Sequence, residues 1–513
     1  MIGTSMKHLL LIGTLALVAF AGAATSGLVP ATVSAQAPDA SDARATGQSS
    51  SRRASESTPA ELDAYGLART RLAADLIAVQ TFRPAYPFWQ HIFTIPDGRI
   101  IYGSARDGRL LAAFPTSGDW SRDGVWEEPS LARVLEGRRL PKRLNDRRDE
   151  VVRLLEPEAG PLVNNPTRGL FLIPNAARYG SFLEEWGTIY ERFGVPAEIG
   201  LSQAILESGL NGRAQSRARA LGFCQFLSRN WSYLNKLAPT VLEAFNQTTQ
   251  APYCAAYLSI LATMYGSFIP ALSEHHAGGV NVGRTVINGE RLGGIDTREQ
   301  YLLGSQFAVG LRDVSIQRYK ELFRTYGVRS ALYAEMVFGN LVNVTRLTAA
   351  QPQDRIFAMR APRPIPLSDI TRKTGLQTDE VKRYNPALLK QVPARANIYL
   401  PTYVKEFGQD VSFWHRPADA RYAVVLNEFL RQTASVEQWH EPSYAATLRT
   451  FQDRFAQTNS EEGSVMATTL AYVISDLRTS RRSAILEDFR TSGQILTLFQ
   501  RGVAELGATF RGL

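Results

Sequence analysis

The stretch VPAEIGLSQAILESGLN at residues 195–211 decides the fold of the central part of this chain. Its apolar residues recur at helical spacing, which predicts a helix over Pro196–Ser208. Gly209 or Asn211 is suited to end that helix, because both residue types accept the left-handed conformation at a helix C-terminus. The predicted helix therefore ends beside a carboxyl group, that of Glu207.

The position of Glu207 in the last turn predicts an unusual acidity. The negative end of the helix dipole disfavours a carboxylate, and an apolar helix face removes water from it. Both effects raise a carboxyl pKa, so we expect Glu207 to be suited to general acid catalysis at neutral pH. The alternative interpretation is an ordinary surface glutamate at a helix end.

A second informative stretch, LGFCQFL at residues 221–227, begins fourteen residues after Glu207. A glycine lets the backbone approach a ligand, and a glutamine offers both a donor and an acceptor, as sugar recognition requires. No Asp or Glu occurs between Ser208 and Leu242. Ordinary glycosidases need a second carboxylate within about 5–10 Å, and the local chain does not supply one.

These motifs resemble a known family. The Glu-Ser-Gly at 207–209 and the Gly-x-x-Gln-Phe at 222–226 are similar to the goose-lysozyme-like catalytic domain of lytic transglycosylases, the SLT family, of the membrane-bound lytic transglycosylase D type. The family's Ala-Tyr-Asn-Ala-Gly motif is similar to EHHAGG at 274–279, where two histidines replace Tyr and Asn. Its Thr-Arg-x-Tyr motif is similar to TREQY at 297–301. The resemblance covers roughly residues 190–305.

The resemblance implies a peptidoglycan lytic transglycosylase, a carbon-oxygen lyase that needs no cofactor. Glu207 would protonate the oxygen between N-acetylmuramic acid and N-acetylglucosamine, then take the proton of the muramic C6 hydroxyl, leaving a 1,6-anhydro end. One carboxylate suffices because the nucleophile belongs to the substrate. Ser208, Gln225, His276 and Tyr301 match positions that bind the substrate or orient the acid. Tyr301 as a core tyrosine is the alternative.

Two other functions stay open. A muramidase hydrolase would need a second acid from a distant segment, such as Glu243, Glu274 or Asp296, to activate water. A non-catalytic peptidoglycan-binding protein of lysozyme fold is suggested by the altered His275-His276 motif. No metal site is expected there, because neighbouring helical residues point about 100° apart and no third ligand is near.

The N-terminus predicts export. Residues 1–35 combine a basic start, an apolar stretch and small residues before Ala35, as a cleaved signal peptide does. A membrane anchor is the alternative, but the apolar stretch is shorter than the ~20 residues needed to span. Residues 36–60 have almost nothing to bury and predict a disordered leader. We expect a periplasmic or envelope-associated protein.

Charge and cysteines fit an exported, wall-bound protein. The net charge of +9 favours anionic surroundings, which for an exported chain means cell-wall polymer or lipid head groups before nucleic acid. The resemblance to the SLT family implies peptidoglycan glycan strands as the partner, and further assembly partners are unknown. The two cysteines, Cys224 and Cys254, form either a disulfide or a pair of buried thiols.

The whole chain is predicted to be mainly α. The expected parts are a mixed α/β region at 61–165, a lysozyme-like transglycosylase domain at 170–345, a LysM-like module at 360–404 and a helical region at 415–513. In the first part, Phe88–Phe114 alternates around two turn signals, which predicts antiparallel strands, and Arg133–Leu155 predicts a helix. Helices of the catalytic domain are expected at Tyr179–Phe193, Pro196–Ser208, Pro252–Tyr265, Arg298–Tyr326 and Val328–Asn343.

The LysM-like module rests on a short pattern. Helical stretches at Ser368–Thr374 and Thr378–Tyr384 precede an apolar strand at Ile398–Pro401. This resembles the strand–helix–helix–strand modules that bind N-acetylglucosamine in glycan, and a non-binding linker domain is the alternative. A binding module would raise the local concentration of substrate.

Overall fold

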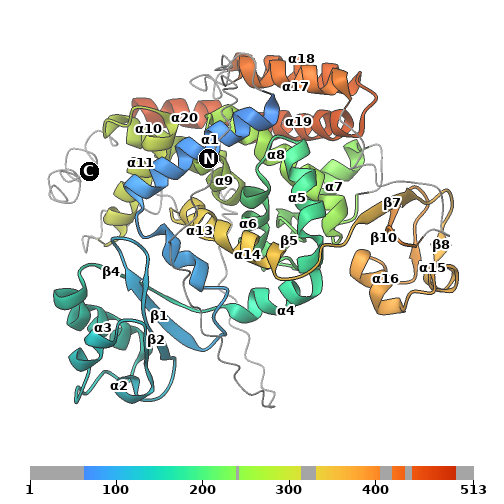
Figure 1. The fold of residues 1–513 in the computed structure, drawn as a ribbon. Helices are drawn as coiled ribbons and strands as arrows, with labels where there is room; N and C mark the ends of the chain where they lie inside the picture. The colour runs from blue at the N-terminus through green and yellow to red at the C-terminus, as the bar shows by residue number, and fades with distance from the viewer. Residues whose placement is uncertain (1–62, 239–241, 314–330, 405–418, 434–441, 493–513) are drawn as a thin grey trace, which may run out of the picture. The chain divides into compact units, whose positions relative to one another are not determined.

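The computed structural model describes residues 63–492, except 239–241, 314–330, 405–418 and 434–441 (Figure 1). The predicted signal peptide and leader lie outside these residues. The described chain is mainly helical with a few small sheets. Within it, no helix is both long and apolar enough to cross a membrane.

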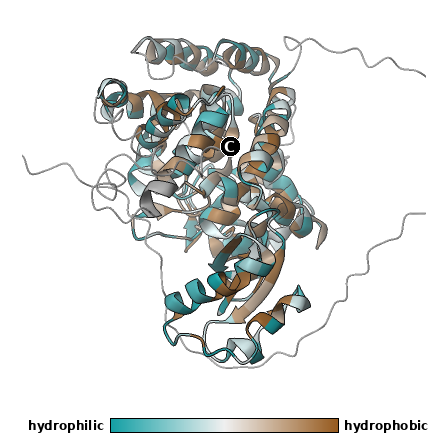
Figure 2. Cartoon of the chain, turned by 90° about the vertical axis from the view of Figure 1, so that its left-hand side faces the viewer, coloured by the Kyte–Doolittle hydropathy of each residue, from teal (hydrophilic) through white to brown (hydrophobic). Residues whose placement is uncertain are grey.

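The N-terminal region contains a four-stranded sheet in the order β3-β2-β1-β4, and each neighbouring pair is antiparallel. The sheet strands are largely apolar, as the brown ribbons in Figure 2 show. The elements are α1 (Ala64–Phe82), η2 (Tyr86–His91), β1 (Arg99–Ser104), β2 (Leu110–Pro115), α2 (Trp120–Asp123), β3 (Val125–Trp126), η3 (Pro129–Val134), α3 (Leu144–Ala159) and β4 (Leu162–Pro166).

Two local predictions fail in this region. The hairpin between β1 and β2 is confirmed, but the chain before it forms the short helix η2 instead of a strand. Phe88 and Trp89 are both buried, and a strand would point two neighbours to opposite faces. The helix predicted from Arg133 begins only at Leu144, because Gly137 adopts a φ of +68° and Pro141 disfavours helix before it.

The central part is helical, as predicted. Its elements are α4 (Gly169–Tyr179), η4 (Gly180–Phe182), α5 (Leu183–Arg192), α6 (Ala197–Ser208), β5 (Ala220–Leu221), β6 (Phe226–Leu227), α7 (Ser228–Leu237), α8 (Gln247–Tyr265), α9 (Phe268–Ala277), α10 (Gly279–Arg291), α11 (Thr297–Asp313), α13 (Tyr333–Gly339) and α14 (Leu341–Ala349). Every α8 residue except Tyr257 is buried, so α8 runs through the core.

Boundaries in this part differ from the predictions in three places. The helix expected from Tyr179 is divided into α4, η4 and α5, and the one expected up to Asn343 is divided into α13 and α14. The helix α8 begins five residues earlier than expected, because the Asn246 side chain accepts hydrogen bonds from two backbone N–H groups of its first turn. Residues 314–326 of the helix predicted from Arg298 are not described.

A small α/β unit follows, built from β7 (Ile356–Arg360), β8 (Ile365–Pro366), α15 (Leu367–Thr374), α16 (Thr378–Tyr384), β9 (Gln391–Val392) and β10 (Asn397–Pro401). The strands β7 and β10 pair antiparallel, which gives the strand–helix–helix–strand order with a core of its own. Both predicted helices and the last strand are present. The Tyr399 hydroxyl lies 3.0 Å from Thr249 Oγ1 and joins the unit to α8.

The C-terminal region is helical, as predicted, over its described residues. It comprises α17 (Ala420–Gln432), α18 (Pro442–Ala456), α19 (Glu461–Thr479) and α20 (Arg482–Thr491). The helix α19 packs on α7 and α8, and α20 packs on α10. These contacts place α19 and α20 against helices that follow Glu207 in the chain.

Candidate active site

Glu207 lies in the last turn of α6, which packs against α5, α13 and α14 (Figure 1). The side chain is 11% exposed. The helix ends at Ser208 as predicted, and Gly209 closes it with a φ of +57° and an N–H bonded to the Ile205 carbonyl. Local sequence thus places the carboxylate at a defined helix end.

Three side chains surround one oxygen of this carboxylate. The Tyr333 hydroxyl donates to Glu207 Oε1 at 2.5 Å. The His276 Nδ1 and His275 Nε2 atoms lie 3.5 Å and 3.9 Å from the same oxygen. The histidines come from the last turn of α9 and the tyrosine from the start of α13. A carboxylate, two imidazoles and a phenol therefore meet at one point.

The two histidines are held by different partners. The His275 Nε2 atom is 2.7 Å from the Cys224 carbonyl oxygen, and its ring lies 5.1 Å from that of Phe226. The His276 ring stacks on Tyr333, with centroids 4.3 Å apart and planes 11° from parallel. His275 thus joins α9 to the Gly222–Leu227 loop, and His276 joins α9 to α13.

The helix α13 is positioned from the N-terminal region. The Trp89 indole N–H donates to Glu335 Oε1 at 2.7 Å, and Arg83 Nε lies 3.5 Å from Glu335 Oε2. All three side chains are buried. Because Glu335 stands two residues after Tyr333, these contacts fix the turn that carries the phenol.

The cluster lowers the pKa of Glu207, which the sequence argument expected to be high. Burial raises the pKa of Glu207, but the hydrogen bond and charge of His276, the charge of His275 and the hydrogen bond from Tyr333 outweigh it. The net pKa of Glu207 lies below its ordinary value, so the prediction of a raised pKa is wrong. That prediction counted burial and the helix dipole, and it could not count donors from α9 and α13.

Ser208 does not face open solvent. It is 1% exposed, and its hydroxyl lies 3.1 Å from the Ala204 carbonyl oxygen and 2.9 Å from that of Phe223. The hydroxyl therefore links the end of α6 to the loop between β5 and β6. Both acceptors are backbone carbonyls, so these contacts fix Ser208 within the protein.

Gln225 stabilises the same loop. Its backbone has a φ of +55°, and its side-chain Nε2 donates to the Gly222 and Ala214 carbonyls at 2.9 Å and 3.2 Å. Gly222 has a φ of +76°, and a Cβ there would lie 2.3 Å from Gln250 Oε1. Only glycine fits this close approach to α8.

The loop is also fixed covalently. Cys224 and Cys254 form a disulfide, with Cα atoms 6.2 Å apart, which joins the loop to α8. Of the two alternatives that the sequence left open, the structure has the disulfide. The Cys224 carbonyl contacts His275, and His275 lies 3.9 Å from Glu207 Oε1, so a single histidine separates the disulfide-bonded cysteine from the carboxylate.

Tyr301 lies in the core rather than beside Glu207. It is completely buried in α11, where burial raises the pKa of its hydroxyl to about 12. The tyrosine that contacts the carboxylate is Tyr333, which sequence reasoning missed. No motif marks Tyr333; it stands among the apolar residues of a predicted helix, and only the packing of α13 on α6 and α9 reveals its role.

The three acids considered for a hydrolase have other partners. Glu274 is bound by Arg482 and Tyr265, and Asp296 is bound by Arg298. Glu243 accepts from Thr249 Oγ1, and burial raises its pKa to about 7. Within the described part of the chain, no group of three or more His, Cys, Asp or Glu could hold a metal ion.

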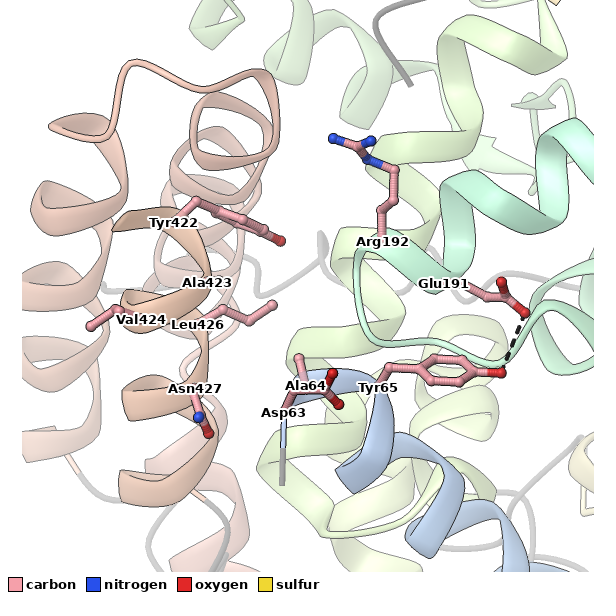
Figure 3. A pocket seen from close by; sticks show the side chains of 10 residues that line it. All are labelled: Asp63, Ala64, Tyr65, Glu191, Arg192, Tyr422, Ala423, Val424, Leu426 and Asn427. Carbon is pink, nitrogen blue, oxygen red and sulfur yellow. Dashed lines mark hydrogen bonds between the residues drawn. The ribbon is translucent and has the colours of Figure 1, made fainter. Parts of the chain in front are cut away.

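A pocket lies elsewhere, between the start of α1, the end of α5 and α17 (Figure 3). Its volume is about 310 Å³. Tyr65 and Glu191 form one wall and are joined by a hydrogen bond, while Tyr422 and Val424 belong to the other wall. Glu207 and its three contacting side chains are not among the residues that line it.

Comparison with known proteins identifies one domain. Residues 186–293 match the family described as transglycosylase SLT domain. The match includes Glu207, Gln225 and His276 but neither Tyr301 nor Tyr333. No curated protein matches the chain. This domain indicates peptidoglycan-cleaving activity of the lytic transglycosylase type outside the cytoplasm, and the mainly helical structure is consistent with a lysozyme-like fold.

Proposed function

We propose that the protein cleaves the β-1,4 bond between N-acetylmuramic acid and N-acetylglucosamine and leaves 1,6-anhydromuramic ends, with Glu207 as the single general acid and base. The observation that carries the proposal is a nearly buried carboxylate in the matched domain, contacted by Tyr333, His275 and His276. The three acids that a hydrolase could recruit each have other partners, as described above, and none of those partners is Glu207.

In the first step, Glu207 gives its proton to the glycosidic oxygen as the bond to the muramic C1 breaks. Glycan that covers the carboxyl excludes water and raises its pKa from the low value of the free protein. His276 lies close enough to exchange a proton with Glu207 through one water or a small ring movement. The cluster therefore offers a route by which resting Glu207 is protonated before the first step, and the C6 hydroxyl returns the proton to it in the second.

In the second step, the Glu207 carboxylate takes the proton of the C6 hydroxyl while that oxygen attacks C1 and closes the 1,6-anhydro ring. The side chains that contact the carboxylate serve here, because positive charge develops on the sugar and a stabilised carboxylate beside it lowers the energy of the transition state. Tyr333 keeps its proton, since burial raises its pKa well above the ordinary value. It holds the carboxylate as a donor throughout.

The altered histidine motif supports a catalytic protein over one that only binds. Both replaced positions put an imidazole within 4 Å of Glu207, and His276 also stacks on the tyrosine that holds it. A fold kept for binding alone has no need of this convergence on one oxygen.

The products of digestion test the proposal. Purified peptidoglycan treated with the full-length protein should release muropeptides with anhydromuramic ends, identified by mass spectrometry from the water they lack. Reducing ends would point to a hydrolase with a second acid. An undigested sacculus that still retains the protein would point to the binding-only alternative.

We also propose how the flanking parts serve the reaction. The unit from β7 to β10 has the strand order of a glycan-binding module, and its binding of N-acetylglucosamine would tether the enzyme to its substrate. The signal peptide proposed to end near Ala35 would deliver the protein to the periplasm or envelope.

His276→Phe should displace the pH profile of activity toward higher pH. His276 lowers the pKa of Glu207, and phenylalanine keeps the stack on Tyr333 without the imidazole, so the pKa of Glu207 rises. Because the first step needs protonated Glu207, activity then persists to higher pH. The measurement is kcat/KM for solubilised glycan across the acidic and neutral range.

His91→Phe is the control for this substitution, because His91 lies in η2 of the N-terminal region. Its profile should follow that of the unchanged protein. A profile for His276→Phe that coincides with the unchanged protein, or moves to lower pH, would contradict the lowering of the Glu207 pKa by His276.

A further inference from the structure

A buried arginine of the C-terminal region binds the helix that carries both histidines. In α20, Arg482 donates to both carboxylate oxygens of Glu274, each at 2.7 Å, and to the Tyr265 hydroxyl at 2.7 Å. Arg482 and Glu274 are 2% and 3% exposed. Arginine and glutamate are almost never fully buried unless they are paired, so the two side chains depend on each other for their buried positions.

The contact lies next to the site. Glu274 directly precedes His275 and His276 in α9, so the bidentate pair fixes the rotation of the turn from which both imidazoles project. The Tyr265 hydroxyl also donates to Glu274 and holds the carboxylate from α8. The His276 contact with Glu207, at 3.5 Å, therefore depends on a turn that is held from outside the matched domain.

The chain makes room for the guanidinium at one glycine. A Cβ at Gly279, the first residue of α10, would lie 2.2 Å from Arg482 Cζ. The segment EHHAGG at 274–279 thus contains the carboxylate that binds Arg482, the two imidazoles at Glu207 and the glycine that admits the arginine. The altered motif and α20 form one structural unit.

Arg482 keeps its charge in the buried pair. Burial lowers the pKa of Arg482, but Glu274 and Tyr265 outweigh it and hold the pKa above its ordinary value. Removal of one charge would leave the other buried without its partner, which displaces the element that carries it. That element is the last turn of α9.

We propose that Arg482 is a positioning residue: through Glu274 it holds the last turn of α9 so that His276 and His275 lie against Glu207, and the C-terminal helical region is a working part of the active centre. This inference rests on the proposed function of Glu207. It gives a role to a region outside the matched domain.

The test compares Arg482→Met with Leu486→Ala in the full-length protein. Leu486 is 2% exposed, lies one turn later in α20, and has an apolar side chain that cannot replace the ion pair. The readouts are kcat and KM for peptidoglycan digestion, the pH profile, and the titration of the His275 and His276 imidazoles by nuclear magnetic resonance.

Arg482→Met should lower kcat by about tenfold to 10²-fold with KM little changed, since a misplacement of about 1 Å near the chemistry has effects of this size. Its pH profile should move in the same direction as that of His276→Phe. Arg482→Lys should restore only part of kcat, because an ammonium cannot bind both carboxylate oxygens in a fork. Leu486→Ala should lower the unfolding temperature but leave kcat and the profile of the folded protein unchanged.

The double variant Glu274→Leu with Arg482→Met removes both charges and leaves neither unpaired. It therefore allows the positioning role to be tested even where the single variant fails to fold. It should fold and still show the lower kcat and the displaced profile. Unchanged kcat, pH profile and imidazole titration in either arginine variant would overturn the positioning role, as would the same changes in Leu486→Ala. An active Glu207→Gln protein would instead overturn the proposed function.

Discussion

Replacing Glu207 by glutamine should lower kcat by roughly 10³- to 10⁴-fold or more, because one side chain supplies both the acid and the base of the reaction. Glutamine has no transferable proton and cannot take one from the C6 hydroxyl. Its amide oxygen still accepts the hydrogen bond that Tyr333 donates to Glu207 Oε1, so the cluster keeps its shape. The measurement is the rate at which soluble muropeptides leave purified peptidoglycan.

Glu198→Gln is the matched control for this change. Glu198 stands in the first turn of the same helix, with a side chain 27% exposed and paired with Arg69 at the surface. Loss of such a pair has little effect, so activity and stability should stay near those of the unchanged protein. Sedimentation with insoluble peptidoglycan should show that Glu207→Gln still binds glycan. Substantial turnover by Glu207→Gln, or an equal loss in Glu198→Gln, would contradict the role of this carboxylate.

The sequence predicted those features of the site that depend on neighbours along the chain. The apolar spacing before Glu207 and the glycine after Ser208 are local signals, and the helix ends where they indicate. The helices and last strand of the β7–β10 unit follow from short-range patterns of the same kind. The failures at Gly137 and Pro141 are local too, since both residues interrupt a helical pattern that periodicity alone extends.

The environment of the carboxylate could not be predicted in this way. Tyr333 lies 126 positions after Glu207 in the chain, and its hydroxyl reaches the acid only because α13 packs on α6. The same holds for Arg482, which is 208 positions from Glu274. The pKa of Glu207 was predicted in the wrong direction for this reason. Burial could be inferred from an apolar helix, whereas the donors that outweigh it come from distant helices.

Gly209→Ala should be among the most destabilising single substitutions near the site, with a loss of roughly 2–4 kcal/mol in the free energy of unfolding. Gly209 has a φ of +57°, where alanine is strained, and a Cβ there would lie 2.1 Å from the Phe171 carbonyl oxygen. That oxygen belongs to the backbone of α4 and cannot swing aside as the end of a flexible side chain does. The end of α6 must move instead, and Glu207 moves with it, so kcat should fall as well.

Gly375→Ala separates the two causes of this loss. Gly375 also closes a helix, α15, with a φ of +71°, but no atom lies within 4 Å of the position that its Cβ would take. Alanine there should lose only the conformational preference of glycine, about 1 kcal/mol. Amide hydrogen exchange in α6 and α15 reports each helix on its own. Equal losses of stability in the two helices would mean that α4 moves aside at little energetic cost. The contact between Gly209 and Phe171 would then have no part in fixing the position of Glu207. We expect a larger loss in α6, together with a lower kcat. The backbone of α4 packs directly on Gly209, so any side chain there displaces the end of α6 and the Glu207 carboxylate with it.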